Sequence, residues 1–391
     1  MILRKLAVQS FFMAKKVSSR LLELLLITLI VKVMIFIIIY LASNLLPFCY
    51  ECYANDLEYL PVYPWSSWLS FSTWDARHYS YLVDTGYHGD MASNAFYPLF
   101  PILVFLLRLI IPNTLLAGFI VSNLASLAAV ALFFLLVKKL YSEEVAFHSG
   151  LFMLLFPTGF YLSLMYSESL FLAFVFGFFY LWESEEYSVA ALVAFLLSLA
   201  RPLGVLVLVP VVVDLVWQWW KFHSLQKLGR NVLLIVASTL GFGAYLLFMY
   251  FTTGAIWQGF EAQRFFIAEN SLTNLLHPWA WLEKNFLSIE LTLHSFTTSL
   301  IDRLFFFGYL CGLAGVYKFL EKRYFWYALV MGLIPALLGS FMAYTRYLLV
   351  VFPLFILLAI ISGKKSPYVA IPFLMLQMLF LIMHVLNFWI A

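Results

Sequence analysis

Charged residues are scarce in this chain: Asp, Glu, Lys and Arg make up 11% of its 391 residues, whereas hydrophobic residues make up 64%. The mean hydropathy is correspondingly high, at +0.95. No soluble core needs so much apolar sequence, so the composition excludes a soluble protein and predicts an all-α polytopic membrane protein. The net charge of +3 is small and does not indicate a nucleic-acid partner.

Cysteines are also few, and metal-ligand patterns are missing. Cys49 and Cys52 form a C-x-x-C pair without further Cys or His partners close by, so we favour a disulfide or free thiols over a metal site. The histidines lack a spacing such as H-x-x-x-H, and we expect neither a metal ion nor another cofactor. A G-x-x-x-x-G-K phosphate loop is absent as well, which argues against a nucleotide-binding domain.

Apolar stretches fill most of the chain, and one transmembrane helix takes roughly 20 apolar residues. We therefore expect about eleven spans in a single transmembrane domain that covers residues 1–391. The expected spans are roughly 21–46, 114–137, 146–164, 168–183, 188–200, 203–219, 231–251, 301–319, 325–343, 347–362 and 367–388. No fixed-period internal repeat or low-complexity linker divides them.

The positions of Lys and Arg predict the topology. Basic residues precede the first span without a signal-peptide cleavage pattern after it, so we expect a cytoplasmic N-terminus. These residues are Arg4, Lys5, Lys15, Lys16 and Arg20. Alternate crossings then place four basic clusters in the cytoplasm, namely Lys138 with Lys139, Lys221 to Arg230, Lys318 to Arg323, and Lys364 with Lys365. This requires the proline-punctuated segment 97–111 to be an interfacial or re-entrant helix, because a true crossing there would invert everything downstream.

Two long loops then lie on the extracytoplasmic face, a first loop over 47–113 with interfacial helices and a second over 252–299. The first loop carries the polar segment Trp74-Asp75-Ala-Arg77-His78-Tyr79. Asp75 either caps a short helix, where Asp is favoured, or acts as a general base toward a hydroxyl group, an effect worth typically ~10²–10⁴-fold. Its charged and aromatic neighbours favour the second interpretation.

This segment opens a series of motifs that resembles the PIG-V family, the GPI mannosyltransferase II group and its prokaryotic relatives. The opening motif is Trp74-Asp75 with Tyr79 and Gly86-Tyr87, then Ala95-Phe-Tyr97-Pro-Leu-Phe-Pro101. The motifs that follow in the same order are Phe156-Pro-Thr158-Gly-Phe160 with Tyr166-Ser167-Glu168-Ser169-Leu170-Phe171, then Leu199-Ala-Arg201-Pro202-Leu-Gly204, and finally Thr345-Arg346-Tyr347-Leu348 with Phe352-Pro353-Leu354-Phe355. Gly254 with Gln263 in the second loop is a weaker match.

The resemblance implies a GT-C type fold, a multi-span helical bundle that takes sugar from a polyprenyl-phosphate donor on the extracytoplasmic or luminal face. It implies a dolichyl-phosphate-mannose type donor, a glycolipid or lipid-linked glycan acceptor, and Asp75 as the base of an inverting transfer. We assign a further group of residues to binding the sugar or the acceptor: Trp74, Tyr79, Glu168, Tyr97, Gln263 and Arg264. For Glu168, the alternative is simply to complement the helix dipole at the start of a span.

The chemistry also predicts a role for arginine. A lipid phosphate leaves as a stabilised anion, so one base suffices where inverting glycosidases need two carboxylates, and the site must supply positive charge to the phosphate. We expect Arg201 and Arg346 to supply it, with Arg77 and His78 behind them. Arg201 precedes Pro202 and therefore lies beside a helix N-terminus, which favours anions. Alternatively, Arg201 and Arg346 extend from span ends toward lipid headgroups.

Two other functions are compatible with a polytopic chain. A transporter or a flippase for a lipid-linked glycan would carry charges near the bilayer midplane and often inverted repeats, whereas here the charges gather at one face. A non-catalytic scaffold would need neither Asp75 nor converging arginines.

Two further groups of charged residues lie outside these motifs. We expect Asp302 and Arg303 to form a local ion pair. We expect Lys32, midway along the first span, to pair inside the bundle or to reach the membrane surface.

Overall fold

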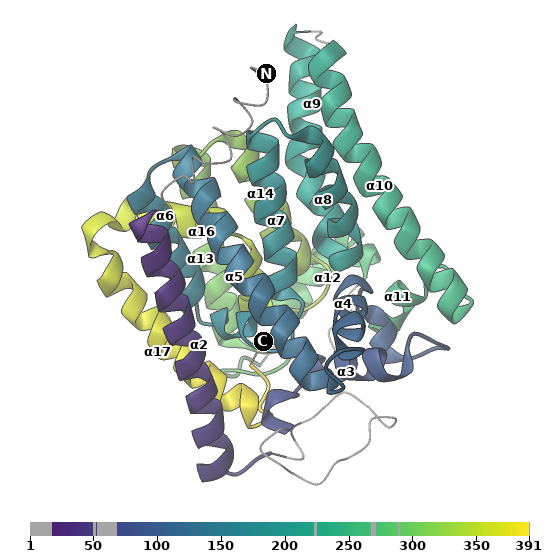
Figure 1. Cartoon of the computed structure of the whole chain (residues 1–391), viewed down its shortest axis with the longest axis vertical. Helices are drawn as coiled ribbons and strands as arrows, with labels where there is room; N and C mark the ends of the chain where they lie inside the picture. The colour runs from purple at the N-terminus through teal and green to yellow at the C-terminus, as the bar shows by residue number, and fades with distance from the viewer. Residues whose placement is uncertain are drawn as a thin grey trace, which may run out of the picture.

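The computed structural model describes residues 18–49, 52, 69–222, 225–266, 271–287 and 290–390. Within these ranges the chain is helical, and its only β-structure is an isolated bridge between Thr292 and Ser299. The basic residues Arg4, Lys5, Lys15 and Lys16 lie outside the described residues. Figure 1 shows the helices packed as a bundle, with α3 and α4 toward one end and the end of α9 and the start of α10 at the other.

The helices follow one another along the chain as α2 (Ser19–Leu45), α3 (Asp75–Thr85), α4 (Leu99–Arg108), α5 (Thr114–Leu140), α6 (Glu143–Leu155), α7 (Glu168–Glu183), α8 (Tyr187–Ala200), α9 (Val209–Phe222), α10 (Leu225–Thr253), α11 (Gln258–Glu261), α12 (Pro278–Leu282), α13 (Leu300–Phe319), α14 (Lys322–Leu337), α15 (Tyr344–Tyr347), α16 (Pro353–Ser362) and α17 (Ser366–Val385). The short 3₁₀ helices η3 (Gly159–Leu162), η4 (Pro202–Leu208) and η5 (Ala262–Phe265) connect some of them.

Five helical stretches are long and apolar enough to cross a membrane, which identifies an integral membrane protein. They are Ser19–Leu45, Thr114–Leu140, Gly229–Thr253, Leu300–Phe319 and Pro353–Val385. Several other expected spans are shorter helices, such as α8 with its 14 residues. The total of about eleven crossings therefore stays a prediction.

Residues 97–111 contain one short helix, α4, over Leu99–Arg108. Its 10 residues extend over about 15 Å at 1.5 Å per residue, half of the roughly 30 Å hydrocarbon core. Arg108 at its end pairs with Asp84 of α3 at 3.0 Å and donates to the Val83 carbonyl oxygen at 3.2 Å. The length of α4 favours the interfacial or re-entrant interpretation over a full crossing.

Basic residues from several helix ends meet acidic residues at the end of the bundle opposite α3 (Figure 1). The contacts are Arg20 with Glu144 at 3.2 Å, Lys138 with Glu143 at 3.4 Å, Arg230 with Glu185 at 3.3 Å and Arg323 with Glu183 at 2.9 Å. Glu183 ends α7, and Glu168 begins it. The 16 residues of α7 thus separate Glu168 from this charged end by about 24 Å.

Lys32 of α2 and the start of the first loop are each tied to a distant segment of the chain. Lys32 pairs inside the bundle, as one of our two alternatives predicted: its Nζ donates to the Leu162 carbonyl oxygen at 2.8 Å and to Ser163 Oγ at 3.3 Å. Cys49 and Cys52 form a disulfide. The Cys49 amide also donates to the Leu386 carbonyl oxygen at 3.0 Å, so the start of the first loop is tied to the end of α17.

Candidate active site

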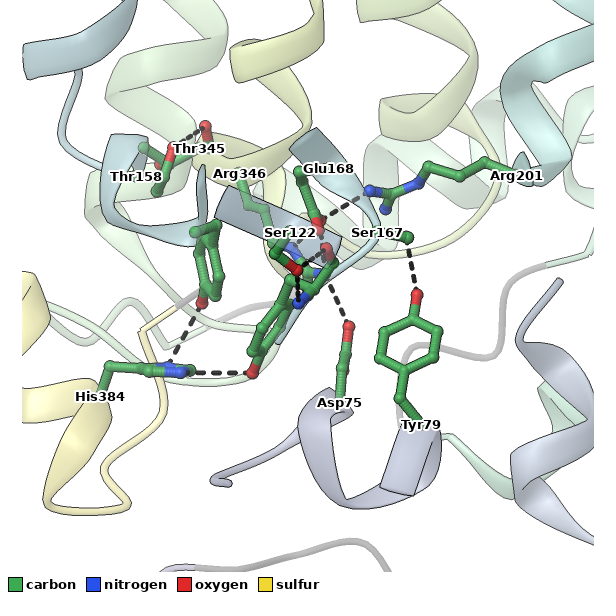
Figure 2. Close-up of polar contacts among 12 residues, drawn as sticks. Asp75, Tyr79, Ser122, Thr158, Ser167, Glu168, Arg201, Thr345, Arg346 and His384 are labelled. Atoms are coloured by element: carbon green, nitrogen blue, oxygen red, sulfur yellow. Dashed lines mark hydrogen bonds and ion pairs between the residues drawn. The ribbon is translucent and has the colours of Figure 1, made fainter. Parts of the chain in front are cut away.

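Four charged side chains from distant parts of the chain meet between the helices (Figure 2). Arg346 Nη2 lies 2.7 Å from Asp75 Oδ2, and Arg346 Nε donates to Glu168 Oε1 at 2.6 Å. Arg201 Nη1 approaches the same Glu168 oxygen at 2.7 Å. Arg346 therefore bridges two carboxylates, and Glu168 bridges two guanidinium groups. Two positive and two negative charges balance in this network.

The exposure of these side chains differs in a way that separates their possible roles. Glu168 is 1% exposed and Arg346 10%, whereas the Asp75 side chain is 21% exposed. Burying charges is costly unless they are paired, and each of these groups is paired. Asp75 is thus the member of the network that a molecule arriving from outside can reach most readily.

Both carboxylates of the network lie at helix N-termini. Asp75 is the first residue of α3 and Glu168 the first of α7, where unpaired backbone N–H groups and the helix dipole favour negative charge. Three donors converge on Glu168 Oε1, but Glu168 Oε2 is buried without a hydrogen-bond partner among the described residues. This oxygen can accept a hydrogen bond from a bound hydroxyl group.

Two residues with positive φ precede the elements that carry Asp75 and Arg346. Trp74 has φ +55° and Ala343 has φ +59°. Such backbone costs on the order of 1–3 kcal/mol in residues other than glycine and persists only where the surroundings enforce it. The Trp74 ring packs edge-on against Trp389 at 5.0 Å and Phe296 at 5.8 Å, which fixes the turn before Asp75.

Asp302 fixes the turn before Arg346. Its Oδ1 accepts hydrogen bonds from the Thr345 amide at 2.8 Å and from Thr345 Oγ1 at 2.7 Å. Arg303 instead donates to the carbonyl oxygens of Asn285, Thr297 and Ser299. The predicted local ion pair between Asp302 and Arg303 is therefore wrong. Asp302 binds the turn before Arg346, whereas Arg303 binds carbonyl oxygens of the second loop, including that of Ser299.

Arg201 reaches Glu168 from the turn between α8 and η4. Pro202 begins η4, and the Gly204 amide donates to the Arg201 carbonyl oxygen at 2.9 Å, which closes the turn. A Cβ atom on Gly204 would lie 1.9 Å from the backbone oxygen of Leu197 in α8. Only glycine allows η4 to pack this closely on α8.

We therefore expect Gly204→Ala to lower the stability by roughly 1–3 kcal/mol, because the added methyl group overpacks against backbone. Gly243→Ala is the matched control: nothing lies within 4 Å of its Cβ position on α10, and alanine favours a helix by roughly 0.5–1 kcal/mol. Thermal unfolding of the detergent-solubilised proteins measures both. Equal melting temperatures for the two variants would contradict the close approach.

Of the residues assigned to sugar or acceptor binding, Tyr79 and Glu168 lie at the network and the others lie beside or away from it. Tyr79 donates from its hydroxyl to Ser167 Oγ at 2.7 Å, next to Glu168. Tyr97 is buried and stacks on Tyr245 at 3.9 Å between ring centroids. Gln263 lies in η5, and Arg264 beside it pairs with Asp90 of the first loop.

The structure brings neither Arg77 nor His78 into the charge network. Arg77 lies half-buried in the first turn of α3. His78 is buried, its Nδ1 lies 2.9 Å from Ser93 Oγ, and its ring stacks on Phe96 at 4.7 Å. Burial lowers the pKa of His78 to about 4, although the Asp75 charge opposes this shift. At neutral pH the imidazole of His78 is therefore uncharged and cannot supply positive charge to a phosphate group.

The pKa of His78 makes the stability depend on pH. Between pH 6.5 and 4 the unfolded chain binds a proton at His78 that the folded protein, with a pKa of about 4, does not bind. The free energy of unfolding therefore falls as the pH drops through this window, by up to about 3 kcal/mol from this residue. We expect His78→Asn to lack this part of the dependence. Parallel stability curves for wild type and variant between pH 4 and 7 would contradict it.

The sequence interpretation missed the side chains that surround Arg346. Its guanidinium carbon lies 4.6 Å from the ring centroid of Tyr161 and 4.8 Å from that of Tyr166, within the range of cation–π attraction. His384 of α17 contacts both tyrosine hydroxyls. Tyr166 stands in one of the quoted motifs, but His384 lies alone in an apolar stretch, where only its polarity could have indicated a role.

The described ranges contain no group of three or more His, Cys, Asp or Glu side chains placed to hold a metal ion. No family model matches the chain, and no curated protein matches it.

In solved structures, the chain is similar to an oligosaccharyltransferase of Archaeoglobus fulgidus. Its apo form has 12% identity and a TM-score of 0.48, with 93% of this chain and 56% of that chain covered. A complex of that enzyme with Zn and sulfate has 10% identity and a TM-score of 0.46, with 92% and 53% covered. A form tethered to an acceptor peptide has 11% identity and a TM-score of 0.45, with 92% and 55% covered. This chain spans little more than half the length of those chains.

Proposed function

We propose that this protein is a membrane glycosyltransferase that moves mannose or a related hexose from a polyprenyl- or dolichyl-phosphate-sugar donor to a hydroxyl group of a glycolipid or lipid-linked glycan. The observation that carries the proposal is the Asp75–Arg346–Glu168–Arg201 network, in which Asp75, the most exposed of the four side chains, contacts Arg346, and Glu168 joins Arg346 to the partly buried Arg201. The motif series shared with the PIG-V family, and the GT-C type fold that it implies, support the same proposal.

In the proposed reaction, Asp75 accepts the proton of the acceptor hydroxyl as its oxygen forms a bond to the anomeric carbon. The bond between that carbon and the phosphate oxygen breaks, and the lipid phosphate leaves with the electron pair. One displacement of this kind inverts the anomeric configuration. Because the phosphate leaves as an anion, no second carboxylic acid has to protonate it, in contrast to the two carboxylates of inverting glycosidases.

The arginines are suited to the charge that develops on the leaving phosphate. The contacts of Arg346 with Glu168 and Asp75 use Nε and Nη2, and Nη1 carries further N–H groups for a phosphate oxygen. Arg201 adds a second positive charge beside it. Donors fixed before the substrate arrives stabilise developing charge without reorganisation. Glu168 holds both arginines in place, and its Oε2 is the proposed acceptor for a sugar hydroxyl.

The other assignments stay proposals of the same kind. Trp74, Tyr79 and Tyr97 would shape the sugar and acceptor side, with Gln263 and Arg264 of the second loop at its edge. The basic residues at the opposite end of the bundle favour the cytoplasm for that end. The network and the first loop would then face the extracytoplasmic or luminal side.

The experiment that tests the function uses purified protein in detergent with radiolabelled dolichyl-phosphate-mannose and a total lipid extract as acceptor. We expect label to move from the donor to a new lipid product. The same protein in liposomes, with donor on one side, tests the alternative function. Movement of intact donor across the bilayer without a new product would favour a flippase, and neither product nor movement would favour a scaffold.

A further inference from the structure

His384 lies in the last turn of α17 and has no part in the assignments above. Its imidazole is buried against the ring of Phe160, at 5.3 Å between ring centroids. Each ring nitrogen meets a tyrosine hydroxyl (Figure 2): Nδ1 lies 3.4 Å from that of Tyr161, and Nε2 lies 3.2 Å from that of Tyr166. One side chain thus joins the two tyrosines that flank Arg346.

The hydrogen bonds of Tyr166 determine the direction of this chain. The Tyr166 hydroxyl donates its one proton to the Thr73 carbonyl oxygen at 3.0 Å. Toward His384 it can therefore only accept, which requires a proton on Nε2 of His384. A neutral imidazole with Nε2–H has a lone pair on Nδ1, and the Tyr161 hydroxyl donates to it. Each group in this series therefore donates its hydrogen bond in the same direction, from Tyr161 to His384, from His384 to Tyr166, and from Tyr166 to the Thr73 carbonyl oxygen.

Three members of this series, Thr73, Tyr161 and Tyr166, lie next to the proposed catalytic pair of Asp75 and Arg346. Thr73 stands two residues before Asp75 in the turn that begins α3. The rings of Tyr161 and Tyr166 contact the Arg346 guanidinium at 4.6 and 4.8 Å. A change at His384 would remove one hydrogen bond from each tyrosine hydroxyl, and so would relax the positions of both rings and of the Thr73 turn that Tyr166 holds.

We propose that His384, as the neutral Nε2–H tautomer, is a positioning residue. Through the hydroxyls of Tyr161 and Tyr166 it fixes the positions of Asp75 and Arg346 relative to each other. The proposal rests on the glycosyl transfer described above and assigns to His384 no contact with the substrates. Replacement of His384 should therefore lower kcat more than it raises KM for the donor.

The first test combines substitutions, with activity measured on the full-length protein in detergent. We expect His384→Phe, which fills the space without hydrogen bonds, to lower kcat at least ~10-fold. We expect His384→Gln, whose amide N–H can reach the position of Nε2, to retain a higher kcat than His384→Phe. In a protein that already carries Tyr161→Phe and Tyr166→Phe, the His384→Phe change should have almost no further effect, because the hydroxyls through which it acts are gone. An equal loss of kcat in both backgrounds, or none in either, would overturn the proposal.

The second test does not depend on activity or on a variant of His384 that folds. Wild-type protein labelled with ¹⁵N in its histidine rings is compared with Tyr166→Phe, in which the partner of Nε2 is lost. We expect one neutral Nε2–H histidine whose ring signals shift between the two proteins. A histidine with a proton on Nδ1 or on both nitrogens, responding to the same change, would overturn the assigned order. If wild type transfers no sugar, the proposed function fails and the positioning role with it, whereas the tautomer still tests the hydrogen-bond chain.

Discussion

Replacement of Asp75 by asparagine should lower turnover by at least ~10²-fold while the protein stays folded. The amide has the shape of the carboxylate and keeps an oxygen for Arg346, whose Nη2 lies 2.7 Å from Asp75 Oδ2. It cannot accept a proton from the acceptor hydroxyl, so the chemical step loses its base. Initial rates with labelled donor at saturating acceptor measure the effect.

Asp84→Asn is the matched control for this experiment. Asp84 lies on the same helix, is 46% exposed, and pairs with Arg108 at 3.0 Å. An exposed pair of this kind contributes roughly 0–1 kcal/mol, so the variant should have nearly wild-type activity and stability. Retained turnover in Asp75→Asn, with Asp84→Asn unchanged, would remove Asp75 from the role of base.

Replacement of Arg346 by methionine should have the largest effect on stability as well as activity. The change leaves Asp75 and the buried Glu168 without the guanidinium that bridges them. Removal of one partner from a buried ion pair costs roughly 3–5 kcal/mol. If Arg346 also stabilises the leaving phosphate, turnover of the protein that remains folded should fall by about 10²-fold or more. Thermal unfolding and transfer rates on the same preparation separate the two losses.

A second substitution distinguishes the structural loss from the catalytic one. In the Arg346→Met protein Glu168 still pairs with Arg201 at 2.7 Å, but the network of Asp75, Glu168 and Arg201 carries one negative charge in excess. Glu168→Gln in that protein removes this excess and should restore part of the stability, because a neutral amide costs less to bury than a carboxylate. Activity should not return, since the guanidinium is still missing. Recovery of activity together with stability would show that Arg346 serves only the fold. Arg108→Gln, at the exposed pair with Asp84, is the control for loss of an arginine.

The candidate site could be predicted from sequence only in part. The motif that contains Glu168 and the turns at Arg201 and Arg346 indicated polar residues at the ends of apolar stretches, and the structure brings these three side chains together with Asp75. His78 stands three residues after Asp75, yet its side chain packs against Ser93 and Phe96 rather than in the network, a contact that no spacing along the helix specifies. Arg264 pairs instead with Asp90, a contact between two loops that no local pattern specifies.

The sequence by itself determined that this protein lies in a membrane and is helical, because its composition leaves too few charges for a soluble surface and a bilayer requires internally paired backbone. It also determined which residue types are available for chemistry. Only the tertiary structure decided that Arg346 joins Asp75 to Glu168, 178 residues earlier in the chain, and that His384 meets both tyrosines around it. Hydrophobic periodicity tells which stretches form helices but not which helix ends meet, since that depends on how side chains pack across the whole bundle.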